Sequence, residues 1–367
     1  MDPTTDVAAR AFFLHALYRQ EPEPAMHALT TFQADTPLDG QVRPSLAVAS
    51  AAADQAAGRR TFDDYRSRLA ANTRRRQDGD LALFAQFLAT VRVTTGDLAS
   101  EPSAWAGITW GLVQAFVAWM LREGYSIGSI NVRLATVKAY AKHAARAGAL
   151  TPQAYALIRT VAGYRHSEGR NVDAQRKQTR VGDKKAEPVT ITPEQAAQLK
   201  AQPPETPQGR RDALLMCLLL DHGLRVGEIA ALPANCIDLK RGRITFYREK
   251  VDKLQTHKLT ADTFRAASDY LARDAPAAGT LLRGSRKNGT LNGPMGARNI
   301  TRRVRVLGEA LGISGLSAHD CRHYWATRAM ERGTDVKTLQ EAGGWNSPAM
   351  PLRYAAAAEI ANDGVKL

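Results

Sequence analysis

The side chains best suited to chemistry gather in four short clusters in the second half of the 367-residue chain. Two clusters contain an arginine, whose forked N–H donors suit the oxygens of a phosphate or a carboxylate. A lysine, a histidine and a tyrosine in the same region can transfer protons or act as a nucleophile. The residues are Arg225 with Glu228, then Lys250, then His319 with Arg322, and finally Trp345 with Tyr354.

The first cluster lies in the run Gly223-Leu224-Arg225-Val226-Gly227-Glu228, where one helix is expected to end at the glycine and another to begin at Arg225. Arg225 and Glu228 are three residues apart and would share a helix face. The carboxylate would then stiffen the guanidinium group and aim its donors. An ordinary structural ion pair is the commoner explanation of such a spacing taken alone.

The next two clusters place single cationic or imidazole groups at the ends of elements. Lys250 follows an apolar strand pattern and precedes a turn with Lys253, where a lysine is either presented to a ligand or simply solvated. Ser317 is expected to cap a helix with His319 and Arg322 near its N-terminus, an end that attracts phosphate. A single His-x-x-Arg spacing also arises by chance.

The fourth cluster joins two glycines and Trp345 to a tyrosine nine residues later. Asn346 or Ser347 would cap a short helix that ends near Tyr354. Taken alone, the tyrosine is more simply interpreted as a buried core residue.

In combination, the order Arg, Lys, His-x-x-Arg, Trp and Tyr within 130 residues resembles the tyrosine recombinase (lambda-integrase) family, which includes the Cre- and Xer-like site-specific recombinases. One departure precedes the tryptophan, where Glu341-Ala342-Gly343-Gly344 replaces the family's commoner Leu-Gly before a histidine, although Gly344 keeps the glycine. The matches are Arg225 for the first arginine, Glu228 for the acidic residue, Lys250 for the hairpin lysine, His319 and Arg322 for the His-x-x-Arg pair, Trp345 for the His or Trp position, and Tyr354 for the nucleophile.

This resemblance implies that Tyr354 attacks a DNA phosphodiester, forms a 3′-phosphotyrosyl bond and releases a 5′-hydroxyl. It implies that Arg225 and Arg322 clamp the phosphate, and that His319 accepts the tyrosine proton or holds a phosphate oxygen. The other implied roles are an indole donor for Trp345, proton donation to the leaving oxygen for Lys250, and orientation of Arg225 or His319 for Glu228. Guanidinium and ammonium groups supply the positive charge, so neither a divalent metal nor another cofactor is expected.

The formal charge of +14 is unevenly spread, with net charges of −4, +10 and +8 over residues 1–57, 58–187 and 188–367. A polyanion that touches both basic segments, double-stranded DNA above all, is the natural partner, and a merely soluble basic surface is the alternative. The predicted DNA contacts are Arg74, Arg75, Arg76, Arg133, Lys138, Arg298, Arg302 and Arg305, together with the basic residues of 165–187.

The pattern of apolar residues and turn residues predicts a mainly α-helical protein with a small antiparallel β-sheet. In the resembled family this is a helical core-binding domain plus an α+β catalytic domain. The predicted parts are an appendage of unknown role at 1–57 with a helix over 7–18, a core-binding domain at 58–164, a basic linker at 165–187, and a catalytic domain at 188–367 that ends in a tail helix.

Within these domains, several elements are predicted from caps, periodicity and glycines. One helix is expected to begin at Asn72 or Thr73, and another to begin at Thr190 or Thr192 with Pro193 in its first turn. Further helices are expected over 109–122 with a stop at Gly124, over 129–146 with a stop at Gly148, over 298–311, and over 355–361 in the tail. Strands are expected at Ile237, 244–247 and 257–259.

Other function classes are disfavoured by composition. The three cysteines lie far apart without CxxC spacing, which favours a reducing cytoplasm over a disulfide scaffold or a zinc site. The longest apolar run covers only residues 213–220, so no membrane span is expected, and the first residues lack the basic region of a secretory signal. A cytoplasmic, nucleoid-associated protein is therefore expected.

The resemblance further implies a homo-tetramer assembled on DNA recombination sites, with the tail docked on a neighbouring protomer. Integration or excision of a mobile element is favoured weakly over resolution of chromosome or plasmid dimers, because the segment 1–57 adds to the length of the minimal resolvases. A type IB topoisomerase-like nicking–closing enzyme and a non-catalytic DNA-binding protein are the alternatives. The sequence leaves open the DNA target and whether accessory or directionality proteins are needed.

Overall fold

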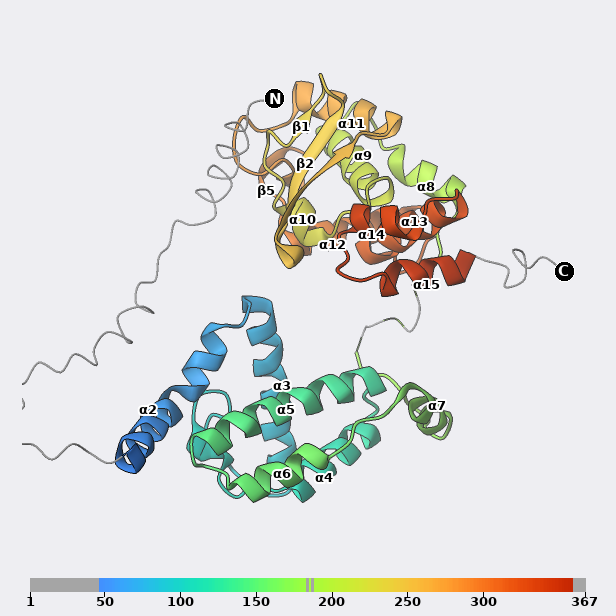
Figure 1. Cartoon of the computed structure of the whole chain (residues 1–367). Coiled ribbons are helices and arrows are strands. Elements are labelled where there is room, and N and C mark those ends of the chain that lie inside the picture. The colour runs from blue at the N-terminus through green and yellow to red at the C-terminus, as the bar shows by residue number, and fades with distance from the viewer. Residues whose placement is uncertain (1–45, 183–184, 186–187, 359–367) are drawn as a thin grey trace, which may run out of the picture. The chain divides into compact units, whose positions relative to one another are not determined.

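The structure is a computed structural model that describes residues 46–182, 185 and 188–358 (Figure 1). The chain divides into two compact units, with the boundary between Asp183 and Lys184. The architecture is mostly helical with a small antiparallel sheet, as the sequence predicts. Among the described residues, no helix is both long enough and apolar enough to span a membrane.

The first unit is helical and is built around α5, which packs against α2, α3, α4 and α6 (Figure 1). Its core centres on aromatic side chains, and Phe84, Trp105, Phe116 and Tyr140 are completely buried. Burying such large rings supplies much of the stabilisation of a small helical domain. The elements are α2 (Leu46–Ser67), α3 (Ala71–Thr90), a 3₁₀ turn (Pro102–Trp105), α4 (Trp110–Arg122), α5 (Ile127–Arg146), α6 (Pro152–Thr160) and α7 (His166–Ala174).

Helix ends in this unit follow the sequence signals closely. The Thr109 side chain caps α4, and Gly124 and Gly148 adopt the left-handed backbone that ends α4 and α5. The predicted cap of α3 at Asn72 or Thr73 is wrong, because the helix already begins at Ala71 and Asn72 instead accepts a hydrogen bond from Arg75.

The predicted boundaries of the first unit also need correction. The limit between residues 57 and 58 falls inside α2, because the alanine-rich stretch from residue 46 continues the helix. Part of the predicted linker forms α7, and beyond it Arg176 donates to the carbonyls of Leu121 (3.1 Å) and Tyr125 (2.9 Å) near the end of α4. The helix predicted over 7–18 lies outside the described residues.

The second unit wraps helices around α9, whose residues 214–220 are at most 3% exposed. Thr192 and Gln195 cap α8 reciprocally, with Pro193 at its first position, as predicted. The helices are α8 (Pro193–Lys200), α9 (Pro207–Leu220), α10 (Val226–Ala230), α11 (Ala261–Arg273), α12 (Ala297–Ala310), α13 (Ala318–Glu331), α14 (Val336–Gly343) and α15 (Ala349–Ala358).

A three-stranded antiparallel sheet of order β1-β2-β3 covers one side of this core. Ile244 pairs with both Ile237 and His257, and Gly242 makes the first turn with a positive φ. The sheet is the one the sequence predicts, whereas the hairpin β4–β5 was not expected. The strands are β1 (Ile237–Asp238), β2 (Arg243–Arg248), β3 (Lys253–Lys258), β4 (Arg283–Ser285) and β5 (Leu291–Pro294).

Two helices of the second unit differ in detail from the prediction. α12 ends at Ala310, so Leu311 is its C-cap and not part of the buried face formed by Ile300, Val304 and Leu307. The short helix expected to end near Tyr354 instead continues to Ala358, and joins the predicted tail without a break. The remaining tail residues, 359–361, lie outside the described residues.

Candidate active site

Six of the seven predicted site residues converge in the second unit, where α13, α14 and α15 pack together (Figure 1). Arg225 stands at the N-cap of α10, and Arg322 lies in the second turn of α13. Trp345 directly follows the end of α14, and Tyr354 lies in α15. The seventh residue, Lys250, lies in the turn that follows β2.

Glu228 is the only carboxylate bonded to the arginines of this cluster among the described residues. It accepts from the Arg225 backbone N–H (2.8 Å) and from Arg225 Nη1 (2.7 Å), so it both caps α10 and holds the side chain. Its other partner is Arg248 at the end of β2, whose Nη1 lies 2.9 Å and 2.8 Å from the two carboxylate oxygens. Of the two residues that Glu228 is predicted to orient, it therefore contacts Arg225, and no hydrogen bond joins it to His319.

The carbonyl groups at the end of α14 are held by three different arginines. Arg248 donates to the carbonyl of Ala342 (2.7 Å), Arg322 to that of Gly343 (2.6 Å), and Arg225 to that of Gly344 (3.1 Å). The last carbonyls of a helix have no intrahelical partner and carry its negative dipole end. The C-terminus of α14 therefore gathers the three guanidinium groups in one place.

These three guanidinium groups face a single carboxylate, so the cluster holds more positive than negative charge. Arg248 is 0% exposed and Arg322 is 4% exposed. Burial, together with the neighbouring charges of Arg225 and Arg248, lowers the pKa of Arg322 well below the ordinary arginine value. A buried surplus of positive charge is costly unless an anion neutralises it, so the arrangement favours binding of an anion.

Tyr354 is buried, and its hydroxyl has no hydrogen-bond partner among the described residues. Burial raises the pKa of Tyr354, although the charges of Arg322, Arg353 and Arg225 oppose the shift. These electrostatic interactions place the phenol within the field of the arginine cluster. A buried, unpaired hydroxyl is unfavourable in a purely structural role, which favours the presented nucleophile over the simple core tyrosine.

Trp345 lies between the arginines and the tyrosine. Its ring is 4.4 Å from the Arg322 guanidinium carbon and 5.8 Å from the Tyr354 ring centroid, and Trp325 stacks on it at 6.1 Å. Gly343 must lack a side chain here, because a Cβ atom would come within 1.9 Å of the Trp345 ring. The indole of Trp345 can therefore occupy this position only because residue 343 is a glycine.

A histidine that sequence reasoning missed joins His319 to the tyrosine. Nε2 of His323 lies 3.0 Å from Nε2 of His319, and its ring meets the Tyr354 ring edge-on at 5.1 Å. Partial burial lowers the pKa of both histidines, which keeps them neutral near pH 7 and able to accept a proton. The signal was the spacing of four residues from His319, which places both rings on one helix face.

Arg248 is the second residue that sequence reasoning missed. It occupies an inward-facing position of β2 together with Ile244 and Phe246, in an alternating pattern of buried residues. An arginine on the apolar face of a strand is unusual, and that mismatch was the available signal.

Lys250 is exposed in the 3₁₀ turn that connects β2 to β3. Within the described residues its side chain makes no hydrogen bond or ion pair. The next residue but one, Asp252, has a positive φ of 47°, which tightens the tip of the hairpin. No bond therefore joins Lys250 to the cluster, although it follows the buried Arg248 by two residues.

The predicted DNA contacts fall into two groups. Arg74, Arg75, Arg298, Arg302 and Arg305 are exposed and form no ion pair among the described residues. Arg76, Arg133 and Lys138 are bonded within the first unit, and Lys185 of the segment 165–187 pairs with Asp320 of the second unit. Arg76 and Arg133 pair with Asp80, and Lys138 donates to the carbonyl of Arg159 (2.9 Å).

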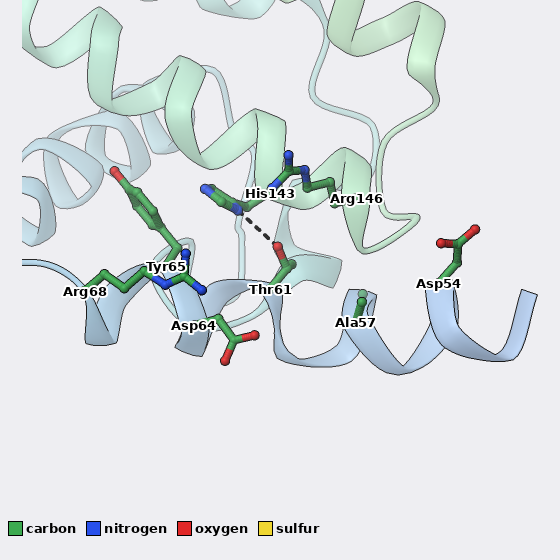
Figure 2. A pocket seen from close by; sticks show the side chains of 9 residues that line it. Asp54, Ala57, Thr61, Asp64, Tyr65, Arg68, His143 and Arg146 are labelled. Carbon is green, nitrogen blue, oxygen red and sulfur yellow. Dashed lines mark hydrogen bonds between the residues drawn. The ribbon is translucent and has the colours of Figure 1, made fainter. Parts of the chain in front are cut away.

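A hollow of about 580 Å³ in the first unit lies between α2 and α5 and includes none of the predicted site residues (Figure 2). Thr61 of α2 approaches His143 of α5 there, with 3.0 Å between Oγ1 and Nδ1. The candidate site is therefore identified by its side chains and not by the size of a cavity.

Both parts of the chain match family models. Residues 190–360 match the phage integrase family, and residues 62–148 match the N-terminal SAM-like domain of phage integrases. The two matches fall on opposite sides of the boundary between the compact units.

Similar proteins include curated tyrosine recombinases. Tyrosine recombinase XerA of Pyrococcus furiosus is 28% identical over 229 residues, which cover 62% of this chain and 68% of the relative. Tyrosine recombinase XerC of Chromohalobacter salexigens is 25% identical over 268 residues, 71% of this chain and 78% of the relative.

Solved structures show the same fold. The Tn1549 transposon integrase in complex with transposon right end DNA has a TM-score of 0.56 at 16% identity, covering 82% of this chain and 97% of that one. A lambda integrase dimer bound to a COC′ core site has a TM-score of 0.54 at 15% identity, covering 89% and 85%.

Proposed function

This chain belongs to the phage integrase family of tyrosine recombinases, which are DNA-cleaving and rejoining enzymes, and we propose that it recombines double-stranded DNA at specific sites through a 3′-phosphotyrosyl intermediate. The observation that carries the proposal is the position of the unpaired Tyr354 hydroxyl beside a buried surplus of guanidinium charge. A phosphodiester is the anion that would satisfy both features, since it neutralises the arginines and offers the tyrosine an electrophile.

In this mechanism, Arg225 and Arg322 each donate to the nonbridging oxygens of the scissile phosphate. Their charge stabilises the additional negative charge that develops as the phosphorus becomes five-coordinate. Both guanidinium groups are already fixed by bonds to backbone carbonyls, which limits the reorganisation that the reaction requires.

The nucleophilic step forms a bond between the Tyr354 oxygen and phosphorus, and breaks the bond from phosphorus to the 5′ oxygen. His319 takes the tyrosine proton, and His323 holds the imidazole of His319 through the shared hydrogen bond. Attack by a 5′-hydroxyl on the phosphotyrosine reverses the step and reseals a strand. The energy of the broken bond is kept in the protein–DNA link, so no ATP is consumed.

The leaving 5′ oxygen needs a proton, and we assign its donation to Lys250. The lysine is exposed at the tip of a hairpin whose strand β3 is tied to α14 by the bond from Gln255 to the carbonyl of Glu341 (2.6 Å). Bound DNA would therefore meet the ammonium group at the edge of the arginine cluster.

The same proposal includes the biological setting. The enzyme integrates or excises a mobile element and acts as a homo-tetramer on its DNA sites, with the segment after Tyr354 docked on a neighbouring protomer. Deletion of residues 356–367 should then spare DNA binding and reduce recombination. Unchanged recombination by the truncated chain would argue against this assembly.

The test of the chemistry begins with duplexes selected by binding from a random pool. Labelled versions with nicks at successive positions trap a covalent product, which runs as a shifted band on a denaturing gel. We expect such a band for the unaltered chain and for Tyr324→Phe, a matched tyrosine variant on α13, and none for Tyr354→Phe. Tight binding without any covalent band would favour the non-catalytic DNA-binding protein. Relaxation of supercoiled DNA without strand exchange between two sites would favour the nicking–closing enzyme.

A further inference from the structure

We propose that Arg248 is a positioning residue for this reaction, which holds Glu228 and the end of α14 so that Arg225 and Trp345 keep their places. The inference rests on the proposed function, because it assigns a role within the same site. Arg248 does not reach the surface, since its side chain is 0% exposed, so it is not assigned a contact with DNA.

The side chain of Arg248 connects three separate elements through its own donors. Nη1 binds both oxygens of Glu228 in α10, and Nη2 binds the carbonyl of Ala342 in α14. Nε donates to Gln255 of β3, which in turn donates to the carbonyl of Glu341. Only the planar, forked guanidinium group can satisfy these acceptors together.

The link to Arg225 runs through the shared carboxylate. Glu228 accepts from Nη1 of both arginines through the same Oε1 atom, at 2.7 Å from Arg225 and 2.9 Å from Arg248. Without Arg248 the carboxylate keeps one cationic partner and is free to turn away. The guanidinium of Arg225 would then lose its fixed direction toward the phosphate.

The link to Trp345 is steric. Gly344 has a φ of +60°, and a Cβ atom there would lie 2.5 Å from Cδ and 2.9 Å from Nε of Arg248. The backbone just before Trp345 therefore rests directly on the arginine side chain. A shorter or more flexible side chain at position 248 would leave the tryptophan segment without this support.

The experiment compares Arg248→Lys with Arg211→Lys in the full chain. Arg211 is a matched control, because it is 1% exposed, pairs with Asp212 and donates to the carbonyl of Arg283, away from the site. Two quantities are measured on the selected nicked duplex: the dissociation constant, and the single-turnover rate of covalent adduct formation at saturating DNA. Thermal melts establish a temperature at which both variants are folded.

We expect Arg248→Lys to lower the adduct rate about 30- to 100-fold with DNA affinity changed by less than about twofold, because the defect lies in alignment and not in binding. Arg211→Lys should lower the melting temperature and leave the rate unchanged. Should Arg248→Lys fail to fold, Gln255→Leu replaces it. That variant removes a partner of Arg248 at a less buried position and should lower the rate about 3- to 10-fold.

A normal adduct rate in Arg248→Lys, or an equal loss in Arg211→Lys, would overturn the positioning role. For the replacement variant, a normal rate in Gln255→Leu would do the same. These results leave the proposed function intact, because the unaltered chain still forms the adduct. Absence of an adduct from the unaltered chain overturns the proposed function, and the role of Arg248 with it.

Discussion

Each unit of the molecule contains a carboxylate shared by two arginines, and the two clusters differ in how their charge is balanced. In the first unit, Asp80 pairs with Arg76 and Arg133 and also accepts from Thr136 (2.8 Å), while the Arg76 side chain remains 43% exposed. Water can therefore solvate the surplus charge. In the second unit the fully buried Arg248 is one partner, and Arg322 adds a further buried charge.

The comparison teaches that an arginine–carboxylate pair indicates a binding site only when charge and burial are considered together. The first cluster connects α3 to α5, and it has two guanidinium groups for one carboxylate, one of them largely open to solvent. The second has three guanidinium groups for one carboxylate, with little water to solvate them, so a bound phosphate would complete it. The helix terminus that collects these arginines has no counterpart in the first cluster.

The largest effect on the rate of covalent adduct formation is expected when the buried charge of Arg322 is removed. Arg322→Gln should lower the rate of covalent adduct formation about 10²- to 10³-fold at saturating DNA, because it removes a charged donor from the transition state. Arg66→Gln in the first unit removes an arginine bonded to Asp78 and Tyr140 and should leave that rate unchanged. Equal rates in the two variants would mean that the buried charge of Arg322 has no catalytic use.

The two shared carboxylates should also respond differently. Glu228→Gln leaves three guanidinium groups without their anion, and should lower the adduct rate about 10- to 100-fold in addition to any loss of stability. Asp80→Asn should lower the free energy of unfolding by about 1–3 kcal/mol and leave the rate at saturating DNA unchanged. Chemical denaturation and single-turnover kinetics on the same samples separate the outcomes. A purely thermodynamic effect of Glu228→Gln would remove the distinction between the clusters.

Alanine substitutions at one glycine in each unit should have smaller effects, on the adduct rate in the second unit and on stability in the first. Gly343→Ala pushes a Cβ atom into the Trp345 ring and should reduce the adduct rate about tenfold. Gly111→Ala in α4 meets only Thr109 Oγ1, at 3.7 Å, and should raise stability by about 0.5–1 kcal/mol through helix propensity. Kinetics and thermal melts of both variants check these values, and a fully active Gly343→Ala would show that the position of Trp345 is unimportant.

The smallest expected effect is the change of the adduct rate with pH. The pKa of His319 and that of His323 lie below the ordinary histidine value of 6.5, so both are neutral at pH 7. As the pH falls through these lowered values, the histidines become protonated and His319 can no longer accept the tyrosine proton. The adduct rate should therefore change less than about twofold between pH 8 and 6.5, and then fall at lower pH. A decline that is complete above pH 6.5 would contradict this assignment.

Much of the fold could be predicted because its signals are local. Thr109, Thr192 and Ser317 each cap the helix that their sequence context predicts. The sequence does not join the first half of α2 to the helical domain, because its side chains are small and exposed and carry no amphipathic pattern, although alanine favours helix. α7 was missed because it has almost no apolar residues, and contacts with neighbouring backbone hold it in place.

The candidate site was predictable in its residue types and less so in its geometry. The spacing around Arg225, His319 and Tyr354 can be recognised along the chain. The convergence of Arg225, Arg248 and Arg322 on the end of α14 depends on contacts between residues about 20 to 120 positions apart, which no local pattern encodes. The sequence alone therefore does not identify Arg248, although its side chain makes more hydrogen bonds than that of Arg225 or Arg322.

The most direct measurement of the central claim is the identity of the residue joined to DNA. The covalent adduct from a nicked duplex is digested with nuclease and trypsin, and the linked peptide is sequenced by mass spectrometry. We predict that the remnant nucleotide is attached through its 3′ phosphate to Tyr354. Attachment to any other side chain, or through a 5′ phosphate, would contradict the account.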